Sequence, residues 1–246
     1  MATKAMKACL FDMDGLLLST EDMYTTATNK VLAKYNKPPL PWSVKLHLQG
    51  RPGAGAAQIL LDWAKLPLTV EEFVSQTSAE QAKLWPTTEF LPGTRELLEY
   101  LHAHKIPIAL ATSSPYDKYI LKSGHLQDTF SLFGKHIVTG DDPRIPPGRG
   151  KPAPDIYLAA LASLNQDRKA AGVQEIKPEE CLVFEDGLAG VESGHAANMT
   201  VIWIPHPELV QLFGKEKLDS ITNSGKGEWL HSMVDLDKKK YGLAAL

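Results

Sequence analysis

The sequence CLFDMDG at residues 9–15 decides the fold that we expect for this chain. It is a short apolar run that ends in two carboxylates, Asp12 and Asp14, and is closed by Gly15. A run of this length and composition fits a buried parallel strand better than a helix. Ligands of open α/β sheets bind beyond the carboxyl ends of the strands, so the pattern places both acids at a binding crevice.

The spacing of the two acids limits what they can do. Two carboxylates at close range are not both stably ionised unless a cation lies beside them or one of them carries a proton. The pair therefore predicts either a Mg²⁺ site or a division into a nucleophile and an acid/base group. An ordinary turn after a strand explains the stretch equally well, because Asp-x-Asp alone is a weak motif.

Length and composition narrow the class of protein. The 246 residues suffice for one large α/β domain or for a core with a smaller insertion. The net charge of -3, from 26 basic and 29 acidic residues, argues against nucleic acid as a partner. The sequence has no signal-peptide pattern, and no apolar stretch is long enough to cross a bilayer. We therefore expect a soluble cytoplasmic protein without a membrane partner, with the nucleus as the alternative compartment.

Two kinds of pattern follow each other along the chain. From about residue 17 to 90 the pattern is helical without a clear strand, and the expected helices cover 20–35, 56–65, 70–75 and 78–85. From residue 91 onward, short apolar runs alternate with helical segments, and the expected strands cover 106–111, 136–139, 181–184 and 201–204. This alternation predicts right-handed crossovers and a parallel sheet.

These patterns predict an α/β fold, a Rossmann-like parallel sheet with helices on both faces and an inserted α-helical cap. The expected core comprises residues 1–16 and 91–246, and the expected cap comprises residues 17–90. Because the insertion follows the first strand, we expect the cap to lie over the carboxyl ends of the strands. The insert between Lys151 and Cys181, with a helix that ends at Leu164 and a polar segment at 165–169, is expected to be a solvated excursion.

Four sets of polar residues stand at the expected strand ends or in the loops beside them. They are Asp12 with Asp14, Thr112 with Ser113, Lys151, and Glu185 with Asp186. Each set alone is typical of turns, helix caps or solvated surface. Together they supply what phosphoryl transfer needs: a carboxylate nucleophile, a second acid, groups that bind phosphoryl oxygens, and carboxylates for a metal.

With these motifs the chain resembles the haloacid dehalogenase (HAD) superfamily of aspartate-nucleophile phosphatases over nearly its whole length. The resemblance rests on FDMDGLLL at 11–18, IALATSS at 108–114, GDDPR at 140–144, GKPAPDI at 150–156 and CLVFEDG at 181–187. The chain is similar in particular to the small-cap subgroup that holds pseudouridine-5'-phosphate and glycerol-3-phosphate phosphatases, and to its fungal members.

The resemblance implies a catalytic role for each acid of the first motif. Asp12 would attack phosphorus and become an aspartyl-phosphate. Asp14 would protonate the departing alkoxide and then deprotonate the water that releases phosphate. Thr112 and Lys151 would bind the phosphoryl oxygens, helped by backbone N–H groups after Asp12 and at Ser113.

The resemblance also implies a metal and a class of substrate. Mg²⁺ would be held by the Asp12 side chain, the Asp14 carbonyl and Asp186, with Glu185 beside them or bound through water. The substrate would be a small phosphorylated metabolite, such as a sugar, polyol or nucleoside monophosphate, with pseudouridine 5'-phosphate as one example. Since each chain carries a full site, we expect a working monomer, with a weak dimer as the alternative.

Two departures from the subgroup bear on substrate choice. The residues after the first motif are Ser-Thr-Glu at 19–21, where Asp-Thr-Glu is usual. Sugar-phosphate mutases of this architecture carry a cap arginine that matches Gly53, and Arg51 lies two residues earlier. Arg51 and Glu21 are our candidates for contacts with the leaving group, although a solvent-facing Arg51 explains the sequence equally well.

Other functions were weighed against the phosphatase. A sugar-phosphate mutase on the same scaffold would need the cap arginine that is missing here. A dehalogenase would not need the second acid, Asp14. A catalytically silent regulatory protein with this fold would not need the acids, the hydroxyl and Lys151 intact. Neither a phosphate-cradling P-loop nor a zinc pattern occurs in the sequence.

Overall fold

A parallel sheet forms the centre of the protein, which we analysed as a computed structural model describing residues 5–49, 51, 53–222 and 227–243. Within these residues the sheet has six strands in the order β3-β2-β1-β4-β5-β6, and all neighbouring pairs run parallel. The strands are β1 (Ala8–Phe11), β2 (Ile108–Ala111), β3 (Ile137–Val138), β4 (Cys181–Glu185), β5 (Thr200–Trp203) and β6 (Gly227–Trp229). The order reverses between β1 and β4, and the crevice at such a switch point is where ligands bind.

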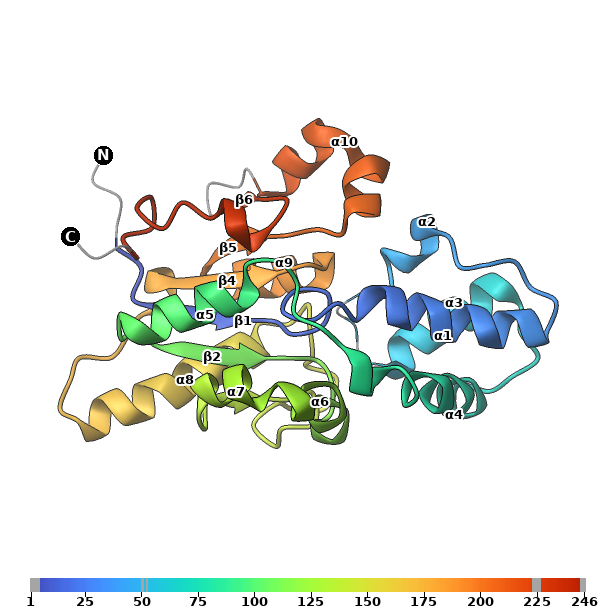
Figure 1. Ribbon diagram of the computed structural model, residues 1–246, viewed down its shortest axis with the longest axis horizontal. Helices are drawn as coiled ribbons and strands as arrows, with labels where there is room; N and C mark the ends of the chain where they lie inside the picture. The colour runs from blue at the N-terminus through green and yellow to red at the C-terminus, as the bar shows by residue number, and fades with distance from the viewer. Residues whose placement is uncertain (1–4, 50, 52, 223–226, 244–246) are drawn as a thin grey trace.

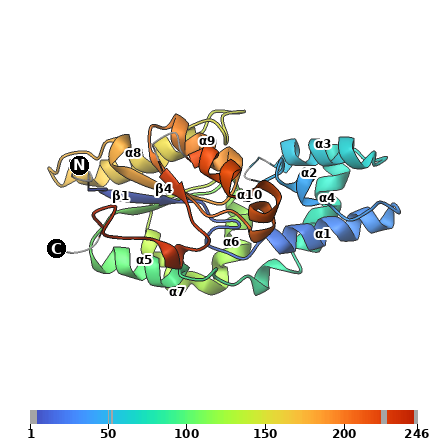
Figure 2. The ribbon, with the colours of Figure 1, turned by 90° about the horizontal axis from the view of Figure 1, so that it is seen from above.

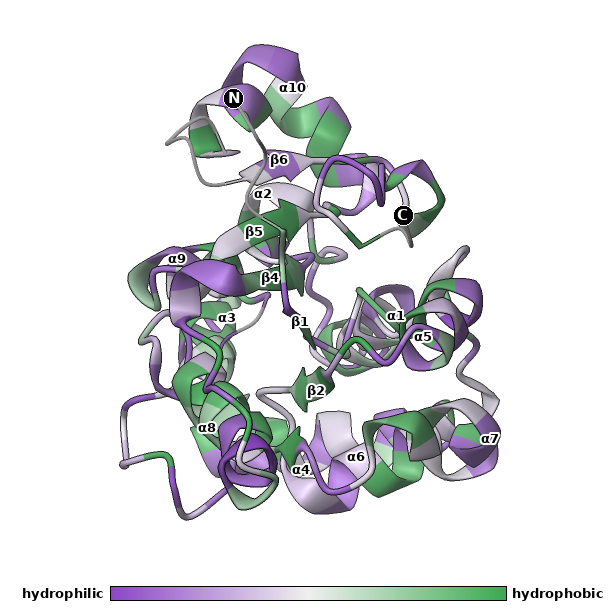
Figure 3. Cartoon of the chain, turned by 90° about the vertical axis from the view of Figure 1, so that its left-hand side faces the viewer, coloured by the Kyte–Doolittle hydropathy of each residue, from purple (hydrophilic) through white to green (hydrophobic). Residues whose placement is uncertain are grey.

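Helices cover both faces of the sheet (Figures 2 and 3). On one face lie α5 (Thr94–Ala103), α6 (Tyr116–Ser123) and α7 (Gln127–Phe130), which share an apolar cluster with β1 and β4. On the other face lie α8 (Asp155–Ala170), α9 (Leu188–Ala196) and α10 (Pro207–Thr222), which share a second cluster with the same strands. The predicted α/β fold with a Rossmann-like parallel sheet is therefore confirmed.

The central strands are buried on both faces, which explains why they appear in the sequence as continuous apolar runs. All four residues of β1 and all five of β4 are buried. At the end of this pair, Phe11 lies opposite Phe184, and their rings stack with centroids 4.6 Å apart. The stacked rings form an apolar layer beside Asp12, which follows β1, and Asp186, which follows β4.

A helical unit lies beyond the carboxyl ends of the strands, at the right of Figure 1. It contains α1 (Glu21–Lys34), α2 (Trp42–Lys45), α3 (Gly53–Ala64) and α4 (Val70–Gln81), followed by the short 3₁₀ helix η1 (Trp85–Thr87). These helices enclose an apolar cluster of their own, with Leu32, Leu61 and Phe73 among its members. The cluster agrees with a separate cap of residues 17–90 on a core of 1–16 and 91–246, a division that stays a prediction.

Several predicted elements differ from the observed ones. The segments predicted as two helices, 70–75 and 78–85, are one helix, α4, which starts at a capping box of Thr69 and Glu72 and ends at Gln81. The polar segment 165–169 is solvated, since Gln166, Asp167 and Lys169 are exposed, but it forms the last turns of α8, which extends beyond the predicted helix end at Leu164. Asn165 on this helix exchanges two hydrogen bonds with the backbone of Ile176, which explains the polar residue there.

Elements near the C-terminus were missed altogether. Helix α10 is interrupted at Gly214, whose φ is 68°, and β6 is three partly exposed residues long. Neither leaves a regular apolar period in the sequence. Over the described residues, no helix has both the length and the apolar character that a membrane span requires.

We predict that Phe184→Ala destabilises the fold by about 3–5 kcal/mol, because it removes a buried ring and leaves a cavity under the strand ends. Urea denaturation followed by circular dichroism measures this free energy of unfolding. Val234→Ala, at a residue that is 67% exposed, is the control and should change it by less than about 0.5 kcal/mol. Similar effects of the two substitutions would contradict the packing described here.

Candidate active site

The turn after β1 brings its two acids out of the sheet at the switch point. The backbone N–H of Asp12 still pairs with the carbonyl of Phe184, so Asp12 continues the strand. The chain then turns at Gly15, whose φ is 76° and whose N–H donates to the Thr20 hydroxyl at 3.0 Å. A Cβ atom on Gly15 would lie 2.3 Å from a carboxylate oxygen of Asp186, so only glycine fits against the acid of the neighbouring strand end.

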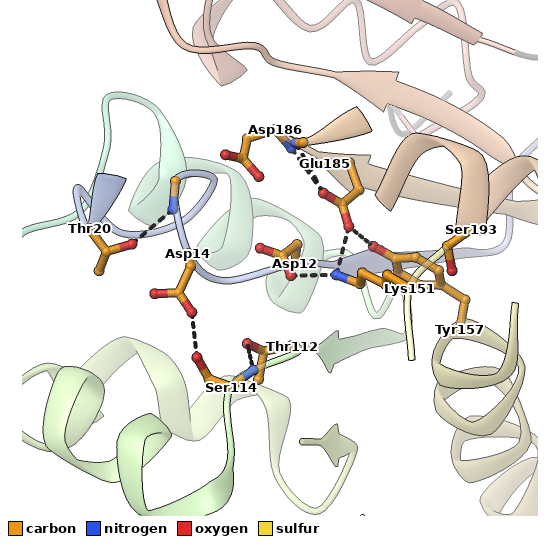
Figure 4. Close-up of polar contacts among 12 residues, drawn as sticks. Asp12, Asp14, Thr20, Thr112, Ser114, Lys151, Tyr157, Glu185, Asp186 and Ser193 are labelled. Carbon is orange, nitrogen blue, oxygen red and sulfur yellow. Dashed lines mark hydrogen bonds and ion pairs between the residues drawn. The ribbon is translucent and has the colours of Figure 1, made fainter. Parts of the chain in front are cut away.

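A buried ion pair joins Asp12 to Lys151 (Figure 4). The Lys151 ammonium lies 2.5 Å from Asp12 Oδ1 and 2.6 Å from Glu185 Oε1, and its side chain is fully buried. Burial raises the pKa of Asp12 to about 7 although Lys151 opposes the rise. A second cation beside Asp12 would favour its ionised, nucleophilic form.

Glu185 holds Lys151 in place and is itself fully engaged. Its Oε1 accepts a hydrogen bond from the Tyr157 hydroxyl at 2.5 Å, and its Oε2 accepts from the backbone N–H of Asp186 at 3.1 Å. The carboxylate lies where a Cβ atom of Gly190 would be, since such an atom would come within 1.8 Å of Oε1. Glu185 therefore orients Lys151, and helix α9 has a glycine at this point to make room for it.

Three buried carboxylates form a site with the composition of a hard-metal site. Oxygens of Asp12, Glu185 and Asp186 lie within 4.8 Å of one another. Lys151 supplies one positive charge against these three groups. Burial and the negative charges around it raise the pKa of Asp186 well above its usual value. The excess negative charge and the all-oxygen donor set fit Mg²⁺, which would relieve this repulsion.

Asp14 points away from this cluster to partners of its own. Its two oxygens lie 2.7 and 2.8 Å from the Lys122 ammonium, and Oδ2 also accepts a hydrogen bond from the Ser114 hydroxyl at 2.7 Å. Burial alone would raise the pKa of Asp14, but the Lys122 ammonium and these hydrogen bonds hold that pKa below its usual value. The two acids of the first motif therefore have different electrostatic surroundings.

Two of the residues predicted to bind phosphoryl oxygens, Thr112 and Ser113, lie in the loop after β2. Thr112 is fully buried, and its hydroxyl accepts a hydrogen bond from the backbone N–H of Ser114 at 3.1 Å. Ser113 lies between them and is partly buried. This loop faces the turn after β1, so the structure places Thr112 near both acids, as Figure 4 shows.

The two candidate contacts from the cap have different positions. Glu21 is buried at the start of α1 with its carboxylate 3.0 Å from the Lys45 ammonium, and its Cγ lies 2.6 Å from where a Gly15 Cβ would be. Arg51 is exposed, and its backbone N–H donates to the carbonyl of Leu48 at 3.3 Å. Within the described part of the chain, no contact joins the Arg51 side chain to the acids.

Sequence reasoning missed several of the described residues that contact the acids. They include Tyr157 on α8, Lys122 on α6, Ser114 after β2, and Gln49 in the cap, whose side-chain amide donates to Asp186 at 3.0 Å. Ser114 lies three residues after the end of β2, in the same loop as Thr112, so its place in the sequence could have identified it. The other three lie on helices or in a cap turn, where their spacing gives no such signal.

Comparisons with known proteins agree with this geometry. A family model for haloacid dehalogenase-like hydrolases matches residues 6–198. A probable pseudouridine-5'-phosphatase of Saccharomyces cerevisiae is 49% identical over 97% of this chain and 98% of its own length. The (DL)-glycerol-3-phosphatase 2 of Arabidopsis thaliana is 35% identical over 95% of this chain and 90% of its own. The crystal structure of a HAD family hydrolase from Deinococcus radiodurans with bound phosphate and sodium is 25% identical, with a TM-score of 0.70 over 98% and 99% of the two chains.

We predict that Gly190→Ala destabilises the protein by about 3 kcal/mol or more, because the new methyl group must displace Glu185 from its buried ion pair. Alanine stabilises a helix more than glycine does, so any loss of stability in this variant must come from the contact with Glu185. Gly55→Ala in α3, where an added Cβ meets nothing within 4 Å, is the matched control and should be neutral or stabilising by up to about 1 kcal/mol. Urea denaturation of both variants measures the difference, and equal stabilities would contradict this placement of Glu185.

Proposed function

The chain belongs to the haloacid dehalogenase-like hydrolases and is a phosphatase, and we propose that it hydrolyses a small phosphorylated metabolite through an aspartyl-phosphate on Asp12, with Mg²⁺ as cofactor. The observation that carries this proposal is the separation of the first-motif acids. Asp12 lies against Lys151 in the carboxylate cluster, whereas Asp14 lies against Lys122 and Ser114. The separation suits one acid to nucleophilic attack and the other to proton transfer.

In the first step of this mechanism, a carboxylate oxygen of Asp12 forms a bond to phosphorus while the bond from phosphorus to the leaving oxygen breaks. Lys151 and the Thr112 hydroxyl, with backbone N–H groups of the same loop, would hold the phosphoryl oxygens in line for attack. This step requires a protonated Asp14, although in the described state Lys122 and Ser114 hold the pKa of Asp14 below its usual value. The protonated Asp14 gives its proton to the departing alkoxide, which leaves as an alcohol.

In the second step, Asp14 takes a proton from a water molecule, and the water oxygen attacks phosphorus and frees Asp12 with release of phosphate. The groups that would hold Mg²⁺ are the side chains of Asp12 and Asp186 and the carbonyl of Asp14, while Glu185 holds Lys151. When bound, the metal supplies positive charge that keeps Asp12 ionised and offsets the charge of the phosphoryl oxygens.

For the substrate we propose a nucleoside monophosphate of the pseudouridine 5'-phosphate type, with a polyol phosphate as the next candidate. Support comes from the relative with 49% identity, named as a pseudouridine-5'-phosphatase, and from the glycerol-3-phosphatase with 35% identity. A mutase must hold a second phosphate with a cap arginine. Gly53 stands at the matching position here, and the nearby Arg51 is exposed, which favours hydrolysis over a mutase reaction. We further propose that the protein acts as a monomer, because one chain supplies all the acids. We also propose that it acts in the cytoplasm.

We predict that the wild-type protein with Mg²⁺ releases phosphate from pseudouridine 5'-phosphate, and that Asp12→Asn abolishes turnover because the amide is not a nucleophile. A phosphate-release assay should include glycerol phosphates, other nucleoside monophosphates, sugar phosphates and FMN. Asp128→Asn, at an exposed aspartate paired with Arg95, is the control and should keep full activity. Absence of turnover of every ester, together with no binding of beryllium fluoride, would refute the phosphatase mechanism.

We predict opposite effects of Asp186→Asn with and without metal. Without Mg²⁺ the variant should be more stable than wild type, because a buried carboxylate with a raised pKa is replaced by a neutral amide. With Mg²⁺ at 100 times its dissociation constant, wild type should gain about 2.7 kcal/mol of stability. The variant should gain almost none at the same concentration, which thermal denaturation with and without chelator measures. An equal gain in both proteins would place the metal elsewhere.

A further inference from the structure

A buried ammonium lies where the cap joins the core. Lys122, in the last turn of α6, is fully buried. Its Nζ lies within 2.8 Å of four oxygens: both carboxylate oxygens of Asp14, the Ser114 hydroxyl and the Tyr24 hydroxyl, the last two at 2.7 Å. An ammonium has three N–H groups, so Asp14, Ser114 and Tyr24 use all of them.

The partners of Lys122 come from both connections between cap and core. Tyr24 lies on α1, directly after the chain enters the cap, and its ring centroid is 5.0 Å from the ammonium. Trp85 lies in η1, where the chain leaves the cap, and its ring centroid is 4.9 Å from the same atom. The carbonyl of Lys122 accepts a hydrogen bond from the Thr88 hydroxyl at 2.6 Å on this return segment.

Stability alone does not account for a lysine in this position. Replacing a buried ion pair by apolar groups of similar size is often neutral or stabilising, because burial removes both charges from water. The arrangement does fix Asp14, since Lys122 contacts both of its oxygens and the Ser114 hydroxyl donates to one of them. A carboxylate held from two sides keeps one orientation relative to Asp12.

We propose that Lys122 is a positioning residue, which holds Asp14 where it can exchange a proton with the leaving group and ties that position to the cap through Tyr24. The proposal rests on the phosphatase function proposed above and adds a residue that acts through Asp14. Proton transfer needs donor and acceptor in hydrogen-bond contact, so a displaced Asp14 serves poorly even when the remaining groups are intact. Loss of Lys122 therefore impairs proton transfer without removing nucleophilic attack by Asp12.

Leaving groups that depart without a proton separate this role from a general structural one. An alkoxide must be protonated as it leaves, whereas nitrophenolate and acetate leave as stable anions. The test compares kcat/KM for an alkyl phosphate with kcat/KM for p-nitrophenyl phosphate or acetyl phosphate, whichever of the two the wild type turns over faster. The variants are Lys122→Met, Ser114→Ala and Tyr24→Phe, each with its melting temperature measured.

The expected result is selective. Lys122→Met should lower kcat/KM for the alkyl phosphate about 100-fold, the usual cost of a small misplacement of a reacting group. Its kcat/KM for the activated ester should fall by less than about 10-fold, and an initial burst of leaving group should appear, because hydrolysis of the aspartyl-phosphate still needs Asp14. Ser114→Ala and Tyr24→Phe should show the same pattern with smaller losses for the alkyl phosphate.

The matched control is Lys118→Met. Lys118 lies one turn earlier on the same helix, with its ammonium 5.5 Å from the Trp85 ring centroid, and it makes no described hydrogen bond to Asp14. This variant removes one positive charge from α6 and should keep the wild-type ratio of the two kcat/KM values. An equal change in Lys118→Met would mean that the charge of α6 matters and not the contact with Asp14.

Other outcomes would overturn the proposal. Equal losses of kcat/KM for both esters in a folded Lys122→Met variant would indicate general damage to the site, and no loss would make Lys122 dispensable. If Lys122→Met does not fold, Ser114→Ala becomes the test. An unchanged ratio of the two kcat/KM values in Ser114→Ala would refute the positioning of Asp14. An unchanged ratio in Tyr24→Phe would refute the link to the cap. Failure of the proposed function is different, because the wild type would then hydrolyse neither ester.

Discussion

The buried pair of Asp12 and Lys151 is the interaction on which the rest of the site depends. Neither charge can remain in the crevice alone, because an unpaired buried charge destabilises a protein by several kcal/mol. Lys151 in turn contacts Glu185, and Glu185 occupies the space left by Gly190 on α9 while accepting a hydrogen bond from α8. Helices α8 and α9 are thus shaped by the site as well as by the sheet they cover.

The centre of the fold could be predicted from the sequence, whereas its edge could not. Strands β1 and β4 are buried on both faces and therefore appear as continuous apolar runs bounded by charged turns. The three residues of β6 are all partly exposed and pair with β5, and α10 is interrupted at Gly214. At such an edge the contacts that stabilise an element are tertiary, so a local pattern of residues does not indicate them.

The clustering of the candidate site residues could be predicted in the same part of the structure, because of the sheet topology. Parallel strands bring their carboxyl ends to one edge, so polar residues directly after predicted strands come together even when they are far apart in sequence. Lys122 follows no strand, and a lysine in the last turn of a helix ordinarily has the helix dipole as its partner. Its contacts with Asp14 and Tyr24 span 108 and 98 residues, and only the folded chain reveals them. Arg51 is the reverse case, a plausible residue in the sequence whose side chain is exposed in the structure.

The insertion of the cap directly after β1 has a consequence for how cap and core communicate. Two contacts link described cap residues on separate helices and turns to the acids or their partners: Tyr24 shares the Lys122 ammonium with Asp14, and Gln49 donates to Asp186 at 3.0 Å. A movement of the cap relative to the sheet must stretch or exchange hydrogen bonds at one or both of these points. The acids at the two points are Asp14, the proposed proton-transfer acid, and Asp186, a proposed Mg²⁺ ligand. In the proposed mechanism, cap position and catalytic competence therefore depend on the same contacts. If the proposed substrate binds between cap and core, it would change the surroundings of both acids at once, without any need for a signal through the apolar core.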